Sequence, residues 1–287
     1  MRSEGWQITE ELEEFVAAAE DFLRAEPDRH NTPLTILDRL RRRGSEGVVF
    51  GWTEGDGGEV GAVFYRLGTG RVTVTPVGPE QADALAVRLV GLGERACGVT
   101  ADHDSATAFA EAWRRRTGAE AVRDWRGRLH RLDALVPPER MPEGRVAARA
   151  GHEQVVCWCR QFCVDVGERA TVDLLDSGAW EASRFADKHF TFWETPDGTP
   201  VSMAGSTGLV GGMVRVDPVS TPAHLRGHGY AAAVTVEVTR AALAAGAEEV
   251  VLFTDPGNPT SNALYRRIGY VPLCEYTGYA FREGATA

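Results

Sequence analysis

The chain has 287 residues, of which 43% are hydrophobic and 25% charged, and its formal net charge is −10. This composition is typical of a globular protein with one large domain or two of ordinary size. The acidic balance disfavours unspecific binding to nucleic acid or to an anionic membrane. The sequence has neither a run of about 18 uncharged apolar residues nor an apolar signal core at its start, so we expect no membrane span and no secretion. The five cysteines are then expected to be reduced thiols in the cytoplasm.

The first half of the chain alternates helical and strand-like patterns. Apolar residues recur at helical spacing over residues 7–24, and Gly-rich turns separate three strand-like runs after a second helix. The expected helices span residues 7–24, 34–43, 79–92 and 105–116, and the expected strands span 47–53, 59–67, 71–77, 97–102, 121–125 and 128–135.

A proline-rich segment divides the chain. Residues 136–145, VPPERMPEGR, contain three prolines and a glycine. We therefore predict a linker at 137–145 between domains at 1–136 and 146–287. The second domain is expected to hold helices at 152–165, 168–184, 229–245 and 259–268, strands at 189–195, 199–207, 211–219 and 248–255, and two final strands.

The two halves show the same order of elements, namely helices, three strands, a helix, a strand, a helix and a pair of strands. Subtracting 151 from the residue number places Gly229 over Gly78 and Gly269 over Gly118. Self-similarity at a fixed offset indicates repeated structural units. We infer an internal duplication.

A short glycine turn is the most informative motif. Residues 226–231, RGHGYA, lie between a strand-like and a helix-like segment. The free N–H groups of a first helical turn, together with the helix dipole, favour an anion such as phosphate. Arg226 adds a cation, and Gly229 allows close approach of the backbone. The alternative is an ordinary strand-to-helix turn that uses glycine for its geometry alone.

The segments after this turn favour the phosphate interpretation. Arg226, Gly229 and Ala231 match the pattern Arg/Gln-x-x-Gly-x-Gly/Ala, and residues 250–273 add a strand, an Asn-led helix, a tyrosine and a Gly-Tyr ending. In this order, residues 186–282 resemble the GNAT superfamily of acyl-CoA-dependent N-acetyltransferases. The resemblance implies a layered α/β fold of two tandem GNAT-like domains, each with a mixed, mostly antiparallel sheet flanked by helices. It also implies acetyl-CoA as co-substrate.

The resemblance assigns roles to residues at both motifs. The strand before the turn is expected to splay from its neighbour and to offer backbone groups to the pantetheine arm, and Tyr265 is expected to protonate the departing thiolate. Asn258 before Pro259 also fits a helix N-cap, Asn262 faces either the cofactor or solvent, and Tyr265 alternatively packs in the core. The implied cofactor-binding residues are Val219, Ser220, Thr221, Arg226, Gly227, His228, Gly229, Tyr230, Ala231, Asn258 and Asn262.

The corresponding turn of the first half lacks these features. Thr75 stands in place of the arginine, Pro76 and Pro79 remove two amide donors, and Glu80 puts a carboxylate where pyrophosphate would lie. We expect a degenerate domain without a cofactor motif, with a structural or substrate-shaping role.

The general base is not identified by the sequence. Asp217, Glu194 and Glu275 lie at strand ends near the expected cleft, although each also fits a solvated surface carboxylate, and the resembled family often uses a water chain. Aromatic residues are candidates for the acceptor pocket or for the core, namely Trp180, Phe190, Phe192, Trp193, Tyr276 and Tyr279.

A metal site is not expected at the cysteine-rich segment. On a helix, Cys159 and Cys163 share one face while Cys157 points away, so the three do not converge with His152. Buried reduced cysteines are the simpler interpretation.

Together, the motifs predict an N-acetyltransferase that moves an acetyl group from acetyl-CoA to a primary amine of a small molecule or peptide, directly within a ternary complex. The alternatives are a non-catalytic acyl-CoA-binding sensor or scaffold, and a transferase that uses another acyl group or an oxygen acceptor. No nucleic-acid or membrane partner is expected, and the choice between monomer and homodimer is left open.

Overall fold

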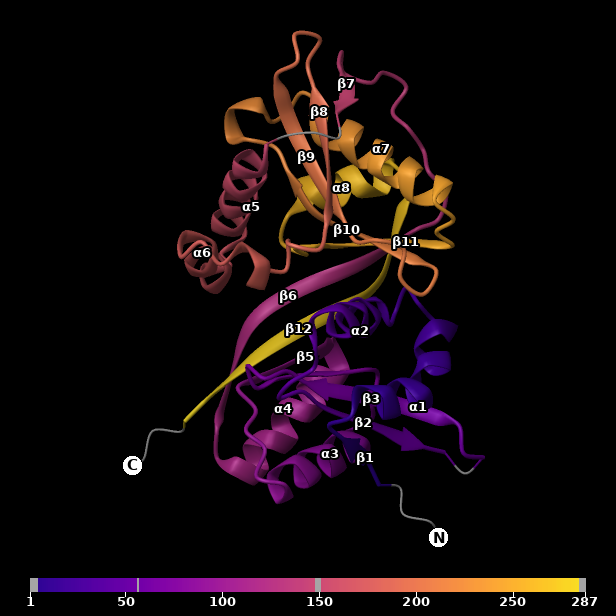
Figure 1. The fold of residues 1–287 in the computed structure, drawn as a ribbon, viewed down its shortest axis with the longest axis vertical. Helices are drawn as coiled ribbons and strands as arrows, with labels where there is room; N and C mark the ends of the chain where they lie inside the picture. The colour runs from indigo at the N-terminus through magenta and orange to yellow at the C-terminus, as the bar shows by residue number, and fades with distance from the viewer. Residues whose placement is uncertain (1–4, 56, 148–150, 284–287) are drawn as a thin grey trace. The chain divides into compact units, whose positions relative to one another are not determined.

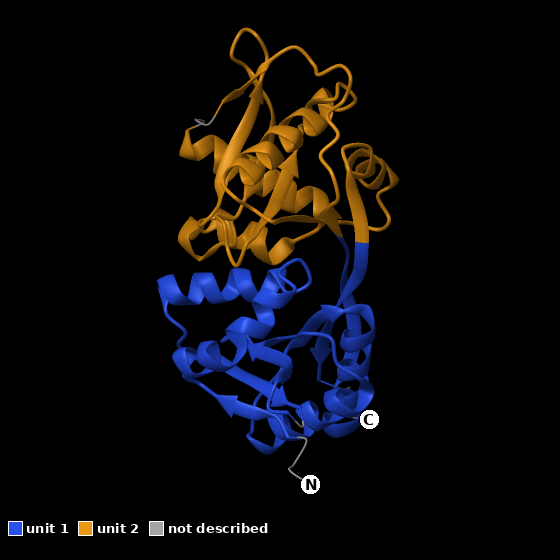
Figure 2. Cartoon of the chain, turned by 90° about the vertical axis from the view of Figure 1, so that its right-hand side faces the viewer, with its two compact units in different colours: residues 1–129, 273–287 blue, residues 130–272 orange. Residues whose placement is uncertain are grey.

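The computed structural model describes residues 5–55, 57–147 and 151–283, and Figure 1 shows the order of its elements. The chain divides into two compact units (Figure 2): unit 1 comprises Met1–Leu129 with Leu273–Ala287, and unit 2 comprises His130–Pro272. Residues 1–4, at the start of the first expected domain, and residues 284–287, at the end of the second, lie outside the described residues.

Unit 1 is built on a sheet with the strand order β1-β2-β3-β4-β5-β12-β6. The helix α3 connects β4 to β5, and these two strands are parallel, as expected for a strand-helix-strand crossover. The other described pairings of this sheet are antiparallel. The helices are α1 (Leu12–Ala25), α2 (Asn31–Arg43), α3 (Pro79–Gly91) and α4 (His103–Thr117). The strands are β1 (Gln7–Thr9), β2 (Val49–Glu54), β3 (Val60–Arg66), β4 (Arg71–Val74), β5 (Gly98–Asp102), most of β6 (Glu120–Leu132) and most of β12 (Tyr270–Arg282).

Unit 2 repeats this plan. Its sheet has the order β11-β10-β9-β8-β7, with the end of β6 beside β11, and α7 connects the parallel strands β10 and β11. The helices are α5 (His152–Val166), α6 (Arg169–Asp176), α7 (Tyr230–Ala244) and α8 (Pro259–Arg267), with short 3-10 turns η1 (Trp180–Ala182) and η2 (Ala223–Leu225). The strands are β7 (Arg145–Ala147), β8 (His189–Glu194), β9 (Pro200–Ser206), β10 (Met213–Ser220) and β11 (Glu249–Thr254).

The sheet of unit 2 buries a different core on each face. Because side chains of a strand alternate, Val214 and Val216 of β10 point to one face, where they pack with Val234 of α7. On β9, Met203 points to the opposite face and packs with Cys159 of α5. The helices α5 and α7 therefore cover opposite faces of this sheet.

The expected fold class is confirmed. The structure is a mixed α/β arrangement with mostly antiparallel sheets flanked by helices, and both units carry a parallel strand pair linked by a helix. Among the helices of the described residues, none is long and apolar enough to cross a membrane.

The two units do not coincide with the domains expected from the sequence. Two long strands, β6 and β12, each begin in one unit and end in the other. β6 ends in unit 2 at His130–Leu132, and β12 enters unit 1 at Leu273. There, β12 pairs with β5 from Tyr276 to Ala280, so the end of the chain completes the sheet of unit 1. The predicted linker at 137–145 lies within unit 2.

Some expected elements differ from those observed. Residues 7–9 form the strand β1 instead of the start of a helix, and the helix expected at 168–184 ends at Asp176, two residues before Gly178 with a positive φ of 78°. The two strands expected at 121–135 form the single strand β6, and the final pair forms the single strand β12. β6 has β12 and β11 as its neighbours, and β12 has β5 and β6. Their continuity depends on these distant strands, which a local sequence pattern does not reveal.

Candidate active site

The strand β10 changes its pairing along its length. It pairs with β11 over Met213–Val216, but with β9 it continues through Val219 and Ser220 after a register irregularity. Among the described residues, β10 has no partner on β11 beyond Val216. The two strands thus part, as expected for residues 218–221, and backbone groups at this edge of β10 are available to a ligand.

The glycine turn follows directly after this parting. Gly227 and Gly229 adopt positive φ angles of 85° and 83°, which favour glycine over any residue with a Cβ. Gly229 is the N-cap of α7, and the first backbone bond into the helix is donated by Ala233 to the Gly229 carbonyl. The N–H groups before Ala233 in this helical turn therefore remain for an anion.

Arg226 is held by two contacts beside the turn. Its Nε donates to the Thr221 carbonyl at 3.0 Å, and its Nη2 lies 2.5 Å from Oδ2 of Asp165 at the end of α5. Both side chains of this ion pair are substantially exposed, at 56% for Arg226 and 34% for Asp165. The cation is thus placed at the turn, and its present partner is an exchangeable surface carboxylate.

The side chains of His228 and Tyr230 make contacts within the turn. The rings of His228 and Tyr230 stack with centroids 5.6 Å apart, and His228 Nδ1 lies 3.0 Å from the Arg226 carbonyl oxygen. The side chain of His228 is therefore engaged within the turn, while the backbone of both residues stays at the start of α7.

Asn258 and Asn262 have clear structural partners. Oδ1 of Asn258 accepts from the Ser261 N–H at 3.1 Å, which makes Asn258 the N-cap of α8 with Pro259 following. Asn262 is 2% exposed, and its amide donates to the carbonyls of Asp255 and Asn258. Asn262 thus faces the interior instead of solvent, and cofactor contact by either residue stays a prediction.

Tyr265 lies on α8, 8% exposed, within the core that α7 shares with β10 and β11. Its ring meets Tyr270 edge-on with centroids 6.1 Å apart, and its hydroxyl has no hydrogen bond among the described residues. Burial raises the pKa of Tyr265, and the nearby Tyr270 and Asp217 raise it further. The ring of Tyr265 therefore packs in the core, and its hydroxyl is not occupied by another hydrogen bond within the described part of the chain and can donate a proton to a ligand.

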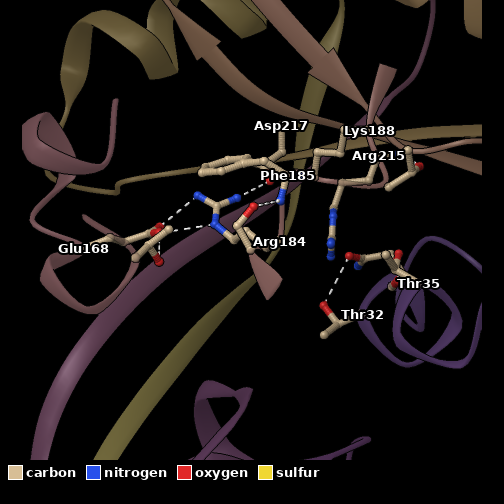
Figure 3. Close-up of polar contacts among 12 residues, drawn as sticks. Thr32, Thr35, Glu168, Arg184, Phe185, Lys188, Arg215 and Asp217 are labelled. Atoms are coloured by element: carbon tan, nitrogen blue, oxygen red, sulfur yellow. Dashed lines mark hydrogen bonds and ion pairs between the residues drawn. The ribbon is translucent and has the colours of Figure 1, made fainter. Parts of the chain in front are cut away.

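The structure brings together a charged cluster that sequence reasoning missed (Figure 3). Arg184 donates from Nη2 and Nε to Glu168, at 2.9 and 3.2 Å, and from Nη1 to Oδ2 of Asp217. Lys188 donates to the same oxygen, and Arg184 lies over the ring of Phe185 at 4.3 Å. Glu168, Arg184 and Lys188 come from loops, which is why periodic patterns gave no signal for this cluster.

Asp217 is poorly suited to act as the base. Burial alone would raise the pKa of its carboxyl group, but Arg184 and Lys188 outweigh burial and hold the pKa far below its usual range. Burial opposes the charge of Arg184 as well, yet the carboxylates of Asp217 and Glu168 raise the pKa of the guanidinium. Both groups therefore stay ionised at neutral pH.

The other candidate bases lie elsewhere. Glu275 belongs to unit 1, where Arg126 and Arg128 bind its carboxylate at 2.7 and 2.6 Å and lower its pKa. Glu194 ends β8 and lies 3.7 Å from Arg145. Glu275 was expected at a strand end of the second domain, but it lies within β12 and belongs to unit 1.

Three of the six candidate pocket aromatics are buried core residues. Phe192 and Trp193 are buried in unit 2, whereas Tyr276 and Tyr279 lie in unit 1, where they bond Arg29 and Thr107. Trp180 and Phe190 are only partly buried and pack at the edge of the core beneath α5.

The equivalent turn of unit 1 is closed. Gly78, the N-cap of α3, has a φ of −77° instead of a positive value, and its N–H donates to Gln81 Oε1 at 3.2 Å. Thr75 is buried and bonds β3 through its hydroxyl. The chain itself therefore supplies the acceptor that a phosphate would otherwise provide.

The cysteines of α5 lie as their helical spacing predicts. Cys159 and Cys163 are buried on one face of the helix, where burial raises the pKa of both thiols, and Cys157 is exposed. Within the described residues no group of three or more His, Cys, Asp or Glu side chains is arranged to hold a metal ion.

Comparison with known proteins agrees with this architecture. Residues 156–270 match the acetyltransferase (GNAT) family. The chain is similar in structure to a tandem GNAT protein from the clavulanic acid biosynthesis pathway, at 14% identity and a TM-score of 0.57, over 98% of this chain and 99% of that one. It is also similar to a GCN5-related N-acetyltransferase from Sphaerobacter thermophilus, at 17% identity and a TM-score of 0.54, over 96% and 94% of the two chains. A comparison with curated proteins gave no match.

The parted strands, the glycine turn and the Asn-capped helix thus lie within a fold shared with acyltransferases. Residues 156–270 match the acetyltransferase (GNAT) family, and the chain as a whole shares the fold of a tandem GNAT protein. The resemblance inferred from the two motifs is confirmed.

Proposed function

We propose that this protein transfers an acetyl group from acetyl-CoA to a primary amine of a small molecule or peptide, within a ternary complex and without a covalent enzyme intermediate. The observation that carries this proposal is the direct succession of the parted strand, the two positive-φ glycines and Arg226 in the family-matched segment. The succession supplies an anion site next to unpaired backbone, as a phosphorylated thioester substrate requires.

The proposed cofactor-binding residues contact different parts of acetyl-CoA. The N–H groups of residues 227–231 and the guanidinium of Arg226 bind pyrophosphate, and the backbone of residues 219–221 binds the pantetheine arm and polarises the thioester carbonyl. Asn258 and Asn262 hold the start of α8, which carries Tyr265, so their structural bonds serve the site indirectly.

Tyr265 is the proposed acid for the thiolate. Its buried phenol stays protonated at neutral pH, because burial raises its pKa. The thiolate that forms beside it in a site shielded from water is a strong base, and it takes the phenolic proton more readily than a thiolate in bulk water would.

Unit 1 is proposed to have a structural or substrate-shaping role, because its turn is closed by Gln81. We also propose a reducing, cytoplasmic location, since all five cysteines are free thiols.

Two measurements test the proposed activity. Release of free thiol from acetyl-CoA is followed across a panel of primary amines and alcohols, and the products are identified by mass spectrometry. Acetylated amine with stoichiometric thiol supports the proposal. Binding of acetyl-CoA without thiol release on any acceptor favours a sensor or scaffold, and product from an alcohol or from a longer acyl-CoA alone favours the other alternative transferase.

A further inference from the structure

Lys188 is unusual in composition as well as in position. It is the only lysine of the chain, and the other 30 of the 31 lysine and arginine residues are arginines. An arginine side chain is always protonated in proteins, whereas a lysine amine loses its proton readily once it is buried. Among the lysine and arginine side chains, Lys188 is therefore the one that can become neutral.

The side chain of Lys188 is buried against the charged cluster. It is 4% exposed, and its Nζ donates to Asp217 Oδ2, the oxygen that also accepts from Arg184 (Figure 3). The other oxygen, Oδ1, has no partner among the described residues, and the Asp217 side chain is 23% exposed. One oxygen of Asp217 is thus occupied by two cations, and the other remains for a hydrogen-bond donor.

This cluster lies where β10 and β11 part. Asp217 directly follows Val216, the last residue of β10 that pairs with β11. Val216 points toward α7, so Asp217 points to the face that α5 covers.

The surroundings of Lys188 make its ammonium lose a proton more easily than that of an exposed lysine. Burial has the largest effect and lowers the pKa of Lys188, Asp217 raises it, and Arg184 and Arg215 lower it, so that the resulting pKa is about 8. Cys159 of α5 is a buried thiol whose pKa is raised by burial, so it adds no charge to this side of the sheet. Among Glu168, Asp217, Arg184 and Arg215 the charges cancel, so proton loss from Lys188 leaves the cluster neutral.

Building on the proposed function, we propose that Lys188 is the base that takes the proton from the acceptor ammonium, and that the ammonium docks on Asp217 Oδ1. A donor bonded to Oδ1 at about 2.8 Å lies a few ångströms from Nζ, because the two oxygens share one carbon. Arg184 is a positioning residue, since it fixes Asp217 from the side of Glu168.

The proton balance is complete. The acceptor R–NH3⁺ gives one proton to the neutral Nζ of Lys188 and becomes R–NH2. Its lone pair forms the C–N bond at the thioester carbon, and the C–S bond breaks. Tyr265 gives its phenolic proton to the departing thiolate, and the second proton of the amine then restores the Tyr265 phenol. Lys188 then releases its proton to solvent, so each cycle yields amide, free thiol and one proton.

Because the chain has a single lysine, nuclear magnetic resonance can observe this amine directly. Protein labelled with ¹⁵N,¹³C-lysine should give one side-chain signal that titrates near pH 8. Asp217→Asn removes the negative partner, so the ammonium is less favoured and the midpoint should move to lower pH. Asp176→Asn, which breaks an exposed ion pair with Arg160 in the same unit, is the matched control and should leave the midpoint unchanged. A wild-type midpoint above pH 10 would overturn the proposal.

Kinetics separate this proposal from the proposed function. With acetyl-CoA and the primary amine that is acetylated fastest in the panel, kcat/KM should rise with pH and share the midpoint of the Lys188 signal. Lys188→Arg keeps the charge but cannot give up a proton, and it should lower kcat about 10²-fold at unchanged coenzyme A affinity. Lys188→Met tests the same loss without a cation. Turnover by Lys188→Arg with the wild-type rate and pH profile overturns the base alone, whereas no acetylation of any amine by the wild type overturns the proposed function and the base together.

Discussion

Asp165→Asn should tighten the binding of coenzyme A, although Asp165 itself is not proposed to touch the ligand. In the structure, Arg226 Nη2 lies 2.5 Å from the Asp165 carboxylate. Pyrophosphate at the glycine turn must compete with this carboxylate for the guanidinium. Removing the carboxylate charge frees Arg226 before the ligand arrives.

The magnitude follows from two contributions. An exposed ion pair contributes roughly 0.2–1 kcal/mol, and this competition is removed by the substitution. A phosphate oxygen on the same guanidinium would lie about 5 Å from the carboxylate, where two unit charges in water repel one another by ~0.8 kcal/mol before salt screening. Together these give about 1 kcal/mol, which corresponds to a roughly fivefold lower Kd.

Isothermal titration calorimetry with coenzyme A at low and high salt measures this effect. The gain should shrink at high salt, because both contributions are electrostatic and exposed. In an Arg226→Ala background, Asp165→Asn should lose most of its effect, since the competition for the guanidinium is then absent. Unchanged or weaker binding by Asp165→Asn would refute the role of Arg226 as the pyrophosphate cation.

Substitutions at Tyr265 and Asn258 probe the second motif, and one truncation probes the sheet of unit 1. Tyr265→Phe should lower kcat about 10²-fold with the same coenzyme A affinity and melting temperature, since the hydroxyl has no hydrogen bond among the described residues; unchanged turnover contradicts the acid role. Asn258→Ala should lower the free energy of unfolding by about 1 kcal/mol, because the helix cap is lost. Asn258→Ser keeps a capping side chain, so weaker coenzyme A binding by this variant at unchanged stability would indicate direct contact with the ligand. A chain that ends at Pro272 lacks the pairing of β12 with β5, and hydrogen exchange should show loss of protection at Gly98–Asp102 but not in β10; equal loss in both strands contradicts the division into units.

The sequence was most informative where structure is local. The α7 helix was expected at 229–245 and spans Tyr230–Ala244, because a positive-φ glycine precedes it and another ends it. Asn258 and Pro259 cap α8 as their adjacency indicates. Both signals depend on residues within one helical turn, so no distant contact is needed to interpret them.

Prediction failed where a residue's partners are far along the chain. Glu275 was expected near the cleft of the second half, but its strand pairs with β5 and carries it to Arg126 and Arg128. The helix expected at 168–184 ends early, and the loop that replaces it holds Arg184. A count of lysines would have directed attention to Lys188, although not to its partner.

The sequence by itself determined the duplicated α/β plan, the family and the turn at Arg226–Ala231, because periodicity, glycine conformation and motif spacing are local properties. Only the tertiary structure decided which strands complete each sheet and that Lys188, Arg184 and Glu168 meet around Asp217. Those arrangements depend on hydrogen bonds and ion pairs between residues up to 33 positions apart in the cluster and far more in the sheets. The spacing of side chains along one segment does not encode such distant pairs.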